Sequence, residues 1–133
     1  MNMKRLLIFG VTALAVLALG GCAAIYDVFT QPTVVGTIAW TDDAQAYNGR
    51  DYLRFTFTLP AGGSDQGCWG TDVYTDDSSI GTAAVHAGLI TFATGGTVTV
   101  RILPGQASYT GSSANGVTSA SYGSWGGSFE FIR

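Results

Sequence analysis

The sequence predicts an α+β domain that consists mostly of antiparallel β-strands and contains one α-helix. Three segments, residues 53–59, 97–103 and 128–132, alternate apolar and polar residues with a period of two. This period is typical of strands that bury one face. Clusters of glycine, proline and asparagine separate the strands, and a single alanine-rich segment carries helix signals at both ends. Together these features favour a small β-rich domain built around one helix.

The first 21 residues have the composition of a bacterial lipoprotein signal peptide. Two basic residues precede an apolar run over residues 6–19, which is shorter than the roughly 20 residues that span a bilayer. The run ends in Leu-Gly-Gly-Cys, which looks like a lipobox, so we expect Cys22 to be acylated and to begin the mature chain. A tether over residues 22–32 and a domain over residues 33–133 would follow. An ordinary signal peptide that ends in a chance cysteine is the alternative.

The mature chain is acidic and has the length of one domain. Without Lys4 and Arg5 it keeps four of the six basic residues against nine acidic ones, a net charge of −5. Such a surface repels phosphate backbones, and no cluster of basic residues marks a nucleic-acid footprint. Residues 22–133 are numerous enough to bury a substantial core. The composition therefore excludes nucleic acid as a partner and favours an exported β-rich protein.

Each predicted strand presents its apolar residues to one side. The residues expected to point inward are Leu53, Phe55, Phe57 and Leu59 in the first strand, Val98, Val100 and Ile102 in the second, and Phe129 and Phe131 in the third. The predicted turns lie at residues 60–63, 95–96, 104–105 and 115–116, where glycine permits a positive φ.

The predicted helix covers residues 80–87. Asp76, Asp77, Ser78 and Ser79 precede it and offer side-chain oxygens to its free N–H groups, and acidic residues there complement the helix dipole. Gly88 follows at the position where a left-handed residue ends a helix. The small alanines within the segment allow sheets to approach closely on several sides.

An ordered series of motifs resembles the LCCL domain, a family of extracellular modules. It begins with WGTDVYTDDSSIGTAAVHAG over residues 69–88 and continues through residues 95–100, 104–109, 115–119 and 122–129 in the family's order. The resemblance implies an LCCL-like fold, with antiparallel β-sheets enclosing one central α-helix. It also implies a module without catalytic activity.

The chain departs from the family at Gly81. The resemblance implies a disulfide-forming cysteine at this position in many members, whereas glycine inside a helix costs about 1 kcal/mol relative to alanine. Cys68 is then the only thiol of the folded domain, since Cys22 is expected to carry lipid. Cys68 is either a small buried apolar side chain or an exposed thiol open to an intermolecular bridge.

The sequence offers little for catalysis. His86 is the only histidine, and we expect it to be a structural core residue that is hydrogen-bonded to a backbone or hydroxyl group. Gly88 is also expected to have a structural role, as the cap of the helix. No lipase-like Gly-x-Ser-x-Gly motif or cluster of zinc ligands is present, and Glu130 is the only glutamate. We therefore predict no enzymatic activity, no catalytic residue, no cofactor and no metal site.

Residues 36–43 and 70–77 echo each other. Both contain Gly-Thr, an aromatic residue at the fifth position and a final Thr-Asp-Asp. Each reads as a strand that runs into an acidic turn. One hypothesis is that both turns contribute carboxylates to a calcium site. The alternative is that the aspartates are solvated turn residues, since their spacing matches no calcium-binding loop.

The function predicted from these features is that of an envelope-anchored binding module for glycan, a lipopolysaccharide-like lipid headgroup or protein. The candidate contact aromatics are Tyr47, Trp69, Tyr74, Tyr109, Tyr122 and Trp125, since such rings offer amphipathic surfaces. The predicted ligand-binding residues are Trp69, Asp72, Tyr74, Asp76 and Asp77. The net charge gives no electrostatic help toward an anionic lipid.

A structural envelope lipoprotein without a small ligand is the alternative function, in which the aromatics are mainly core. In either case the membrane is a partner through the lipid on Cys22. Ala23 rather than aspartate follows that cysteine. This favours the periplasmic face of the outer membrane or the cell surface as the location.

Overall fold

The computed structural model describes residues 31–133. The predicted signal peptide, Cys22 and most of the tether lie outside these residues. The elements in chain order are β1 (Thr33–Thr37), the 3-10 helix η1 (Gln45–Tyr47), β2 (Arg54–Leu59), β3 (Gly70–Thr71), β4 (Val73–Thr75), α2 (Ile80–His86), β5 (Gly96–Gln106), β6 (Ser113–Ala114), β7 (Val117–Thr118) and β8 (Trp125–Ile132). The described domain is mostly sheet with one short α-helix, as the predicted α+β class requires.

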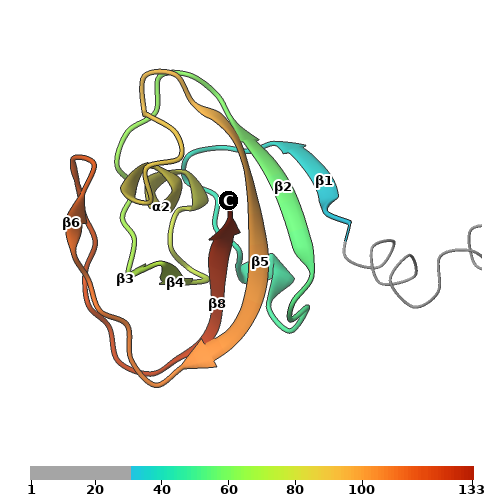
Figure 1. The fold of residues 1–133 in the computed structure, drawn as a ribbon, viewed down its shortest axis with the longest axis vertical. Helices are drawn as coiled ribbons and strands as arrows, with labels where there is room; N and C mark the ends of the chain where they lie inside the picture. The colour runs from blue at the N-terminus through green and yellow to red at the C-terminus, as the bar shows by residue number, and fades with distance from the viewer. Residues whose placement is uncertain (1–30) are drawn as a thin grey trace, which may run out of the picture. The chain divides into compact units, whose positions relative to one another are not determined.

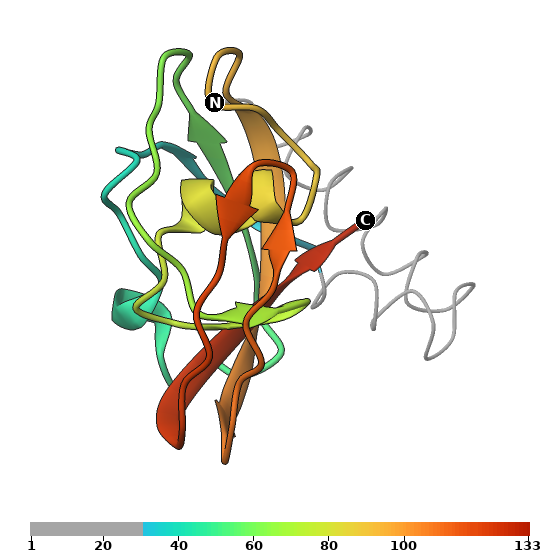
Figure 2. The same cartoon turned by 90° about the vertical axis from the view of Figure 1, so that its left-hand side faces the viewer.

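Six strands form one sheet in the order β1-β2-β5-β8-β4-β3, and β6 and β7 form a separate hairpin (Figures 1 and 2). The pairs β2–β5, β5–β8, β8–β4 and β4–β3 are antiparallel. The expectation of purely antiparallel sheets is wrong at the edge, where β1 runs parallel to β2. A parallel pair needs a connection of about a dozen residues or more, and residues 38–53, which include η1, provide one.

The inward faces of the central strands form the core. All three strands predicted from alternation are present, and Phe57, Val100 and Phe129 are almost fully buried within them. The prediction that Leu53 points into the core is wrong, because Leu53 precedes β2 and is 47% exposed. The buried apolar residues of β2, β5, β8 and α2 belong to one cluster. Burial of this apolar area is the main contribution to stability.

The prediction of a turn at Pro104–Gly105 is wrong. Here β5 continues through both residues to Gln106, and Pro104 pairs with Gly127 of β8. The fixed φ of proline is compatible with extended backbone. Glycine is required at position 105 because a Cβ there would lie 2.0 Å from the carbonyl oxygen of Trp125. The Pro-Gly pair therefore marks a close approach of two strands and not a turn.

Helix α2 begins at Ile80, as predicted, and ends at His86, one residue before the predicted end. The Ser79 hydroxyl accepts a hydrogen bond from the Thr82 N–H (3.0 Å), and Gly88 has a φ of 78° just after the helix. Every residue of α2 is buried. The helix packs on one face of the sheet and is also in contact with β7 (Figure 1). Within residues 31–133, no helix is long and apolar enough to cross a membrane.

Candidate functional site

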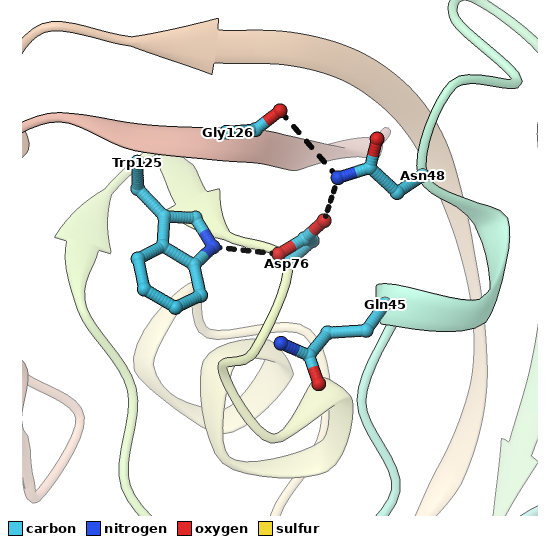
Figure 3. Close-up of a pocket in the computed structure, with 5 residues that line it drawn as sticks. All are labelled: Gln45, Asn48, Asp76, Trp125 and Gly126. Carbon is cyan, nitrogen blue, oxygen red and sulfur yellow. Dashed lines mark hydrogen bonds between the residues drawn. The ribbon is translucent and has the colours of Figure 1, made fainter.

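An open pocket of about 350 Å³ lies where η1, the β4–α2 turn and the start of β8 meet (Figure 3). Its lining residues are Gln45, Asn48, Asp76, Trp125 and Gly126. Gln45 belongs to η1, Asn48 follows it, and Asp76 lies between β4 and α2. The pocket is thus assembled from three segments that are far apart in the sequence.

Asp76 holds these three segments together. Its backbone N–H donates to the Gly127 carbonyl (3.0 Å), and its own carbonyl accepts from the Ala44 N–H (2.8 Å). Its carboxylate accepts the indole N–H of Trp125 at Oδ1 (2.7 Å) and the side-chain N–H of Asn48 at Oδ2 (2.8 Å). Asp76 is only 2% exposed. Four hydrogen bonds therefore fix one buried residue at the base of the pocket.

Glycine at position 127 makes room for this arrangement. A Cβ at Gly127 would lie 2.0 Å from Oδ2 of Asp76 and 2.4 Å from Nδ2 of Asn48. Such separations are well below van der Waals contact. Any larger residue at this position would therefore displace the carboxylate and the amide that line the pocket.

The Asp76 carboxylate has no ion-pair partner among residues 31–133, where the pair of Arg101 with Glu130 is the single salt bridge. Two neutral N–H donors hold it instead. Each of its oxygens accepts one of these hydrogen bonds, and the residue is almost closed to solvent. Figure 3 shows the Gln45 amide facing the Asp76–Trp125 pair, with no hydrogen bond to the other four lining residues. The exposed Gln45 amide is therefore a polar group of the pocket that a ligand can use.

An aromatic wall completes the site. The Trp125 ring is half-buried, and its N–H points to Asp76 (Figure 3). Tyr122, which is 46% exposed, meets this ring edge to face with a centroid separation of 5.6 Å. The lining contains no histidine, serine, threonine or cysteine. Its chemistry is that of binding through an aromatic face and amide groups.

The structure does not bring the five predicted ligand-binding residues together. Asp76 lines the pocket, and Asp77 beside it is half-buried. Asp72 is exposed with a φ of 65° in the β3–β4 turn, and Trp69 is half-buried and bridges to Ala120. The prediction that Tyr74 binds a ligand is wrong, because Tyr74 lies on the inward face of β4 and is 1% exposed. A buried ring cannot offer its face to a ligand at the surface.

Tyr74 and His86 form a buried polar pair within the core. The Tyr74 hydroxyl lies 2.8 Å from Nδ1 of His86, and Nε2 of His86 lies 3.0 Å from the Ser112 carbonyl. Since a carbonyl only accepts, we assign the ring proton to Nε2, so that Nδ1 accepts from Tyr74. Burial raises the pKa of Tyr74 to about 12. The single histidine thus joins α2 to β4 and to the segment before β6.

The two acidic turns meet through backbone hydrogen bonds. The Ala44 N–H donates to the Asp76 carbonyl (2.8 Å), and the Ile80 N–H donates to the Asp42 carbonyl (3.0 Å). The carboxylates of Asp42 and Asp43 accept nearby backbone N–H groups within their own turn. No group of three or more His, Cys, Asp or Glu residues that could hold a metal occurs in residues 31–133. The calcium hypothesis therefore lacks a site in this part of the chain.

Cys68 lies in the core and is 2% exposed. Burial raises the pKa of the Cys68 thiol, although a hydrogen bond with Ser119 acts in the opposite direction. Of the two interpretations made from the sequence, the structure fits the small buried side chain. An exposed thiol that forms an intermolecular bridge does not fit this burial.

Three of the lining residues, Gln45, Asn48 and Gly126, were not predicted from the sequence. Neither amide belongs to a recognisable motif. The one available signal was the echo between residues 36–43 and 70–77, since those two turns pair through their backbones and thereby place η1 beside Asp76. Trp125 was among the candidate aromatics, whereas Tyr109, another candidate, is buried.

Comparison with known proteins agrees with the motif resemblance. The family model of the LCCL domain matches residues 30–129. Human vitrin is 44% identical over 78 residues, which are 57% of this chain and 11% of vitrin. Human cysteine-rich secretory protein LCCL domain-containing 2 is 47% identical over 55 residues, 41% of this chain and 11% of that protein. Guinea pig (Cavia porcellus) cochlin is 44% identical over 65 residues, 49% of this chain and 12% of cochlin. The matched stretch spans about a tenth of each relative's length.

Proposed function

The chain belongs to the LCCL domain family, and from this premise we propose that it is a non-catalytic binding module of the bacterial cell envelope. In this proposal a lipid on Cys22 anchors the chain, and residues 33–133 present a ligand-binding surface. The ligand is an envelope glycan, a lipid headgroup such as that of lipopolysaccharide, or a protein. The location is the periplasmic face of the outer membrane or the cell surface.

The observation that carries the proposal is the pocket formed by Gln45, Asn48, Asp76 and Trp125. It is open, it has an aromatic wall, and hydrogen bonds fix the side chains of Asp76, Asn48 and Trp125. Small-molecule sites typically combine an apolar or aromatic lining with a few placed polar groups. The lining includes no nucleophile with a neighbouring base, which general acid–base or covalent catalysis requires.

The interior supports a rigid binding scaffold. We take α2 as a central helix enclosed by the six-stranded sheet and the β6–β7 hairpin, in agreement with the burial of all its residues. His86 serves this scaffold and not a reaction, since its ring nitrogens face Tyr74 and Ser112 inside the domain. A preformed site loses less entropy on binding than a flexible one.

A structural envelope lipoprotein remains the second candidate function. The observation in its favour is that one tryptophan and two tyrosines, Trp40, Tyr74 and Tyr109, are buried. Such rings stabilise the domain and contact no partner. Trp125 and Tyr122 separate the two candidates, because their rings are at least partly open to solvent.

The direct test is a titration of the full chain, purified in detergent micelles, with envelope glycans, lipopolysaccharide and peptidoglycan fragments, each with and without calcium. Tryptophan fluorescence reports binding. We expect at least one ligand to give a saturable change that Trp125→Phe alters. A chain that responds to no member of the panel would favour the structural function.

A further inference from the structure

We propose that the pocket between η1 and β8 binds a neutral sugar residue, with the Trp125 ring as the stacking surface and the Gln45 amide as the hydrogen-bonding group. This inference rests on the proposed binding function and adds its site and ligand class. Three features carry it: the fixed orientation of Trp125, the unused amide of Gln45, and the charge of the lining.

The orientation of Trp125 is fixed before any ligand arrives. Its indole N–H donates to Oδ1 of Asp76 (2.7 Å), and Asp76 is itself held by backbone hydrogen bonds to Gly127 and Ala44. Tyr122 contacts the ring edge to face. Immobilising a free side chain costs about 0.5–1.5 kcal/mol on binding. Here that cost is met during folding, so a ligand meets a prepared aromatic surface.

Asp76 acts in this site as a positioning residue. At 2% exposure its carboxylate is almost closed to solvent, and each of its oxygens already accepts an N–H, one from Trp125 and one from Asn48. It therefore sets where the Trp125 ring and the Asn48 amide lie. The groups that contact the ligand are Trp125 and Gln45.

Gln45 supplies the polar complement. It is exposed, it belongs to the single turn of η1, and its amide faces the Trp125 side of the pocket (Figure 3). An amide carries two donors and a carbonyl acceptor. A sugar hydroxyl also donates and accepts, so adjacent hydroxyls match the two ends of one amide. The apolar face of a sugar ring matches the indole face opposite.

The charge of the lining excludes the other ligand classes. Asp76 is the one ionisable side chain among the lining residues, so an anion such as a phosphate finds no positive partner there. The net charge of −5 on residues 22–133 opposes anions as well. A cation finds a carboxylate that is buried and hydrogen-bonded at both oxygens. Neutral hydroxyl groups fit the remaining lining groups, which are uncharged. A volume of about 350 Å³ lies at the small end of ligand pockets and suits one sugar residue.

The test is a nuclear magnetic resonance titration of the ¹⁵N-labelled full chain in micelles. The chain has three tryptophans, so three indole N–H signals can be assigned with Trp→Phe variants at positions 40, 69 and 125. The probes are methyl glucoside, methyl mannoside and N-acetylglucosamine, with inorganic phosphate and tetramethylammonium as charged controls. We expect one of the sugars to shift the Trp125 signal saturably, with little dependence on salt, and neither charged control to do so.

Exposed glutamines provide matched variants that leave folding intact. Gln45→Ala should raise the dissociation constant about five-fold through the loss of one or two hydrogen bonds. Gln66→Ala, at an exposed glutamine outside the lining, should leave it unchanged. Equal affinity of Gln45→Ala and the wild type would overturn the assignment of the amide.

Failure of this inference is distinguishable from failure of the proposed function. If only a charged probe, or a lipid or protein ligand, binds and the Trp125 signal stays in place, the neutral-sugar site is wrong while the binding function stands. If the chain binds no probe here and none of the wider panel, both are wrong. Trp125→Phe, which keeps a ring without the indole N–H, should bind more weakly than the wild type.

Discussion

Replacement of Gly81 by alanine tests the packing of α2 most sharply, because helix propensity and packing predict opposite changes in the free energy of unfolding. Within a helix, alanine is more favourable than glycine by about 1 kcal/mol. A Cβ at position 81, however, would lie 2.4 Å from Cε3 and 2.8 Å from Cζ3 of Trp40, and 3.1 Å from Cδ1 of Leu59. Local propensity therefore predicts a more stable protein, and the structure predicts a less stable one.

Further contacts restrict the Trp40 ring. A Cβ at Gly63 would lie 2.0 Å from Cε2, which shows how closely that glycine also approaches the ring. The indole N–H also donates to the Pro60 carbonyl (2.9 Å). Overpacking costs about 1–3 kcal/mol, and loss of the hydrogen bond adds about 1 kcal/mol. After the gain in helix propensity, Gly81→Ala should lower the free energy of unfolding by about 2 kcal/mol.

Urea denaturation of the full chain measures this difference, provided that the slope of the free energy against urea stays constant between variants. Gly123→Ala is the control, since no atom lies within 4 Å of a Cβ built there, and it should change stability by less than about 0.5 kcal/mol. In the Trp40→Leu background, Gly81→Ala should lower the free energy of unfolding by much less than it does in the wild type. A Gly81→Ala protein as stable as the wild type or more stable would refute the packing argument. The Trp40 ring thus occupies the space beside Gly81, where the family resemblance implies a cysteine in many members.

Three other predictions follow from the anchor and the core. Cys22→Ala should accumulate as unprocessed precursor and leave the detergent phase, because stable attachment needs acyl chains that contribute about 0.8 kcal/mol per buried CH₂; lipid labelling of that variant would contradict the anchor. His86→Ala should lower the free energy of unfolding by about 1–3 kcal/mol in urea denaturation, because Tyr74 loses its buried acceptor, yet the folded fraction should retain ligand affinity. The pKa of Tyr74 rises from 10.0 to about 12 on folding, so its neutral form stabilises the protein fully below pH 10.0 and this contribution is lost as the pH rises toward 12. Urea midpoints across this range should fall less steeply in Tyr74→Phe than in the wild type, and parallel curves would contradict the assignment.

Local patterns predicted the central elements of the fold. The alternation in β2, β5 and β8 and the caps of α2 depend on residues within one segment, which is why they can be recognised without the structure. The parallel pairing of β1 with β2 and the continuation of β5 through Pro104–Gly105 depend on a distant partner strand. No local signal distinguishes a Pro-Gly turn from a Pro-Gly pair that another backbone approaches.

The difference between local signals and contacts with distant segments also explains which residues of the candidate site were predicted. Asp76 and Trp125 were named from the sequence because an acidic turn and an aromatic residue are chemically conspicuous. Gln45 and Asn48 were not, since neutral amides carry no signal until the Ala44–Asp76 backbone hydrogen bond places them at the pocket. Tyr74 was named as an amphipathic contact aromatic, whereas the pleat of β4 turns its ring inward.

Binding of the full chain to an array of immobilised neutral glycans, compared with that of Trp125→Ala, tests the central claim most directly. The account predicts that the wild type and Gln66→Ala bind the same neutral sugars, that Gln45→Ala binds them more weakly, and that Trp125→Ala binds none while circular dichroism shows it folded. Absence of binding by the wild type, or undiminished binding by folded Trp125→Ala, would contradict it.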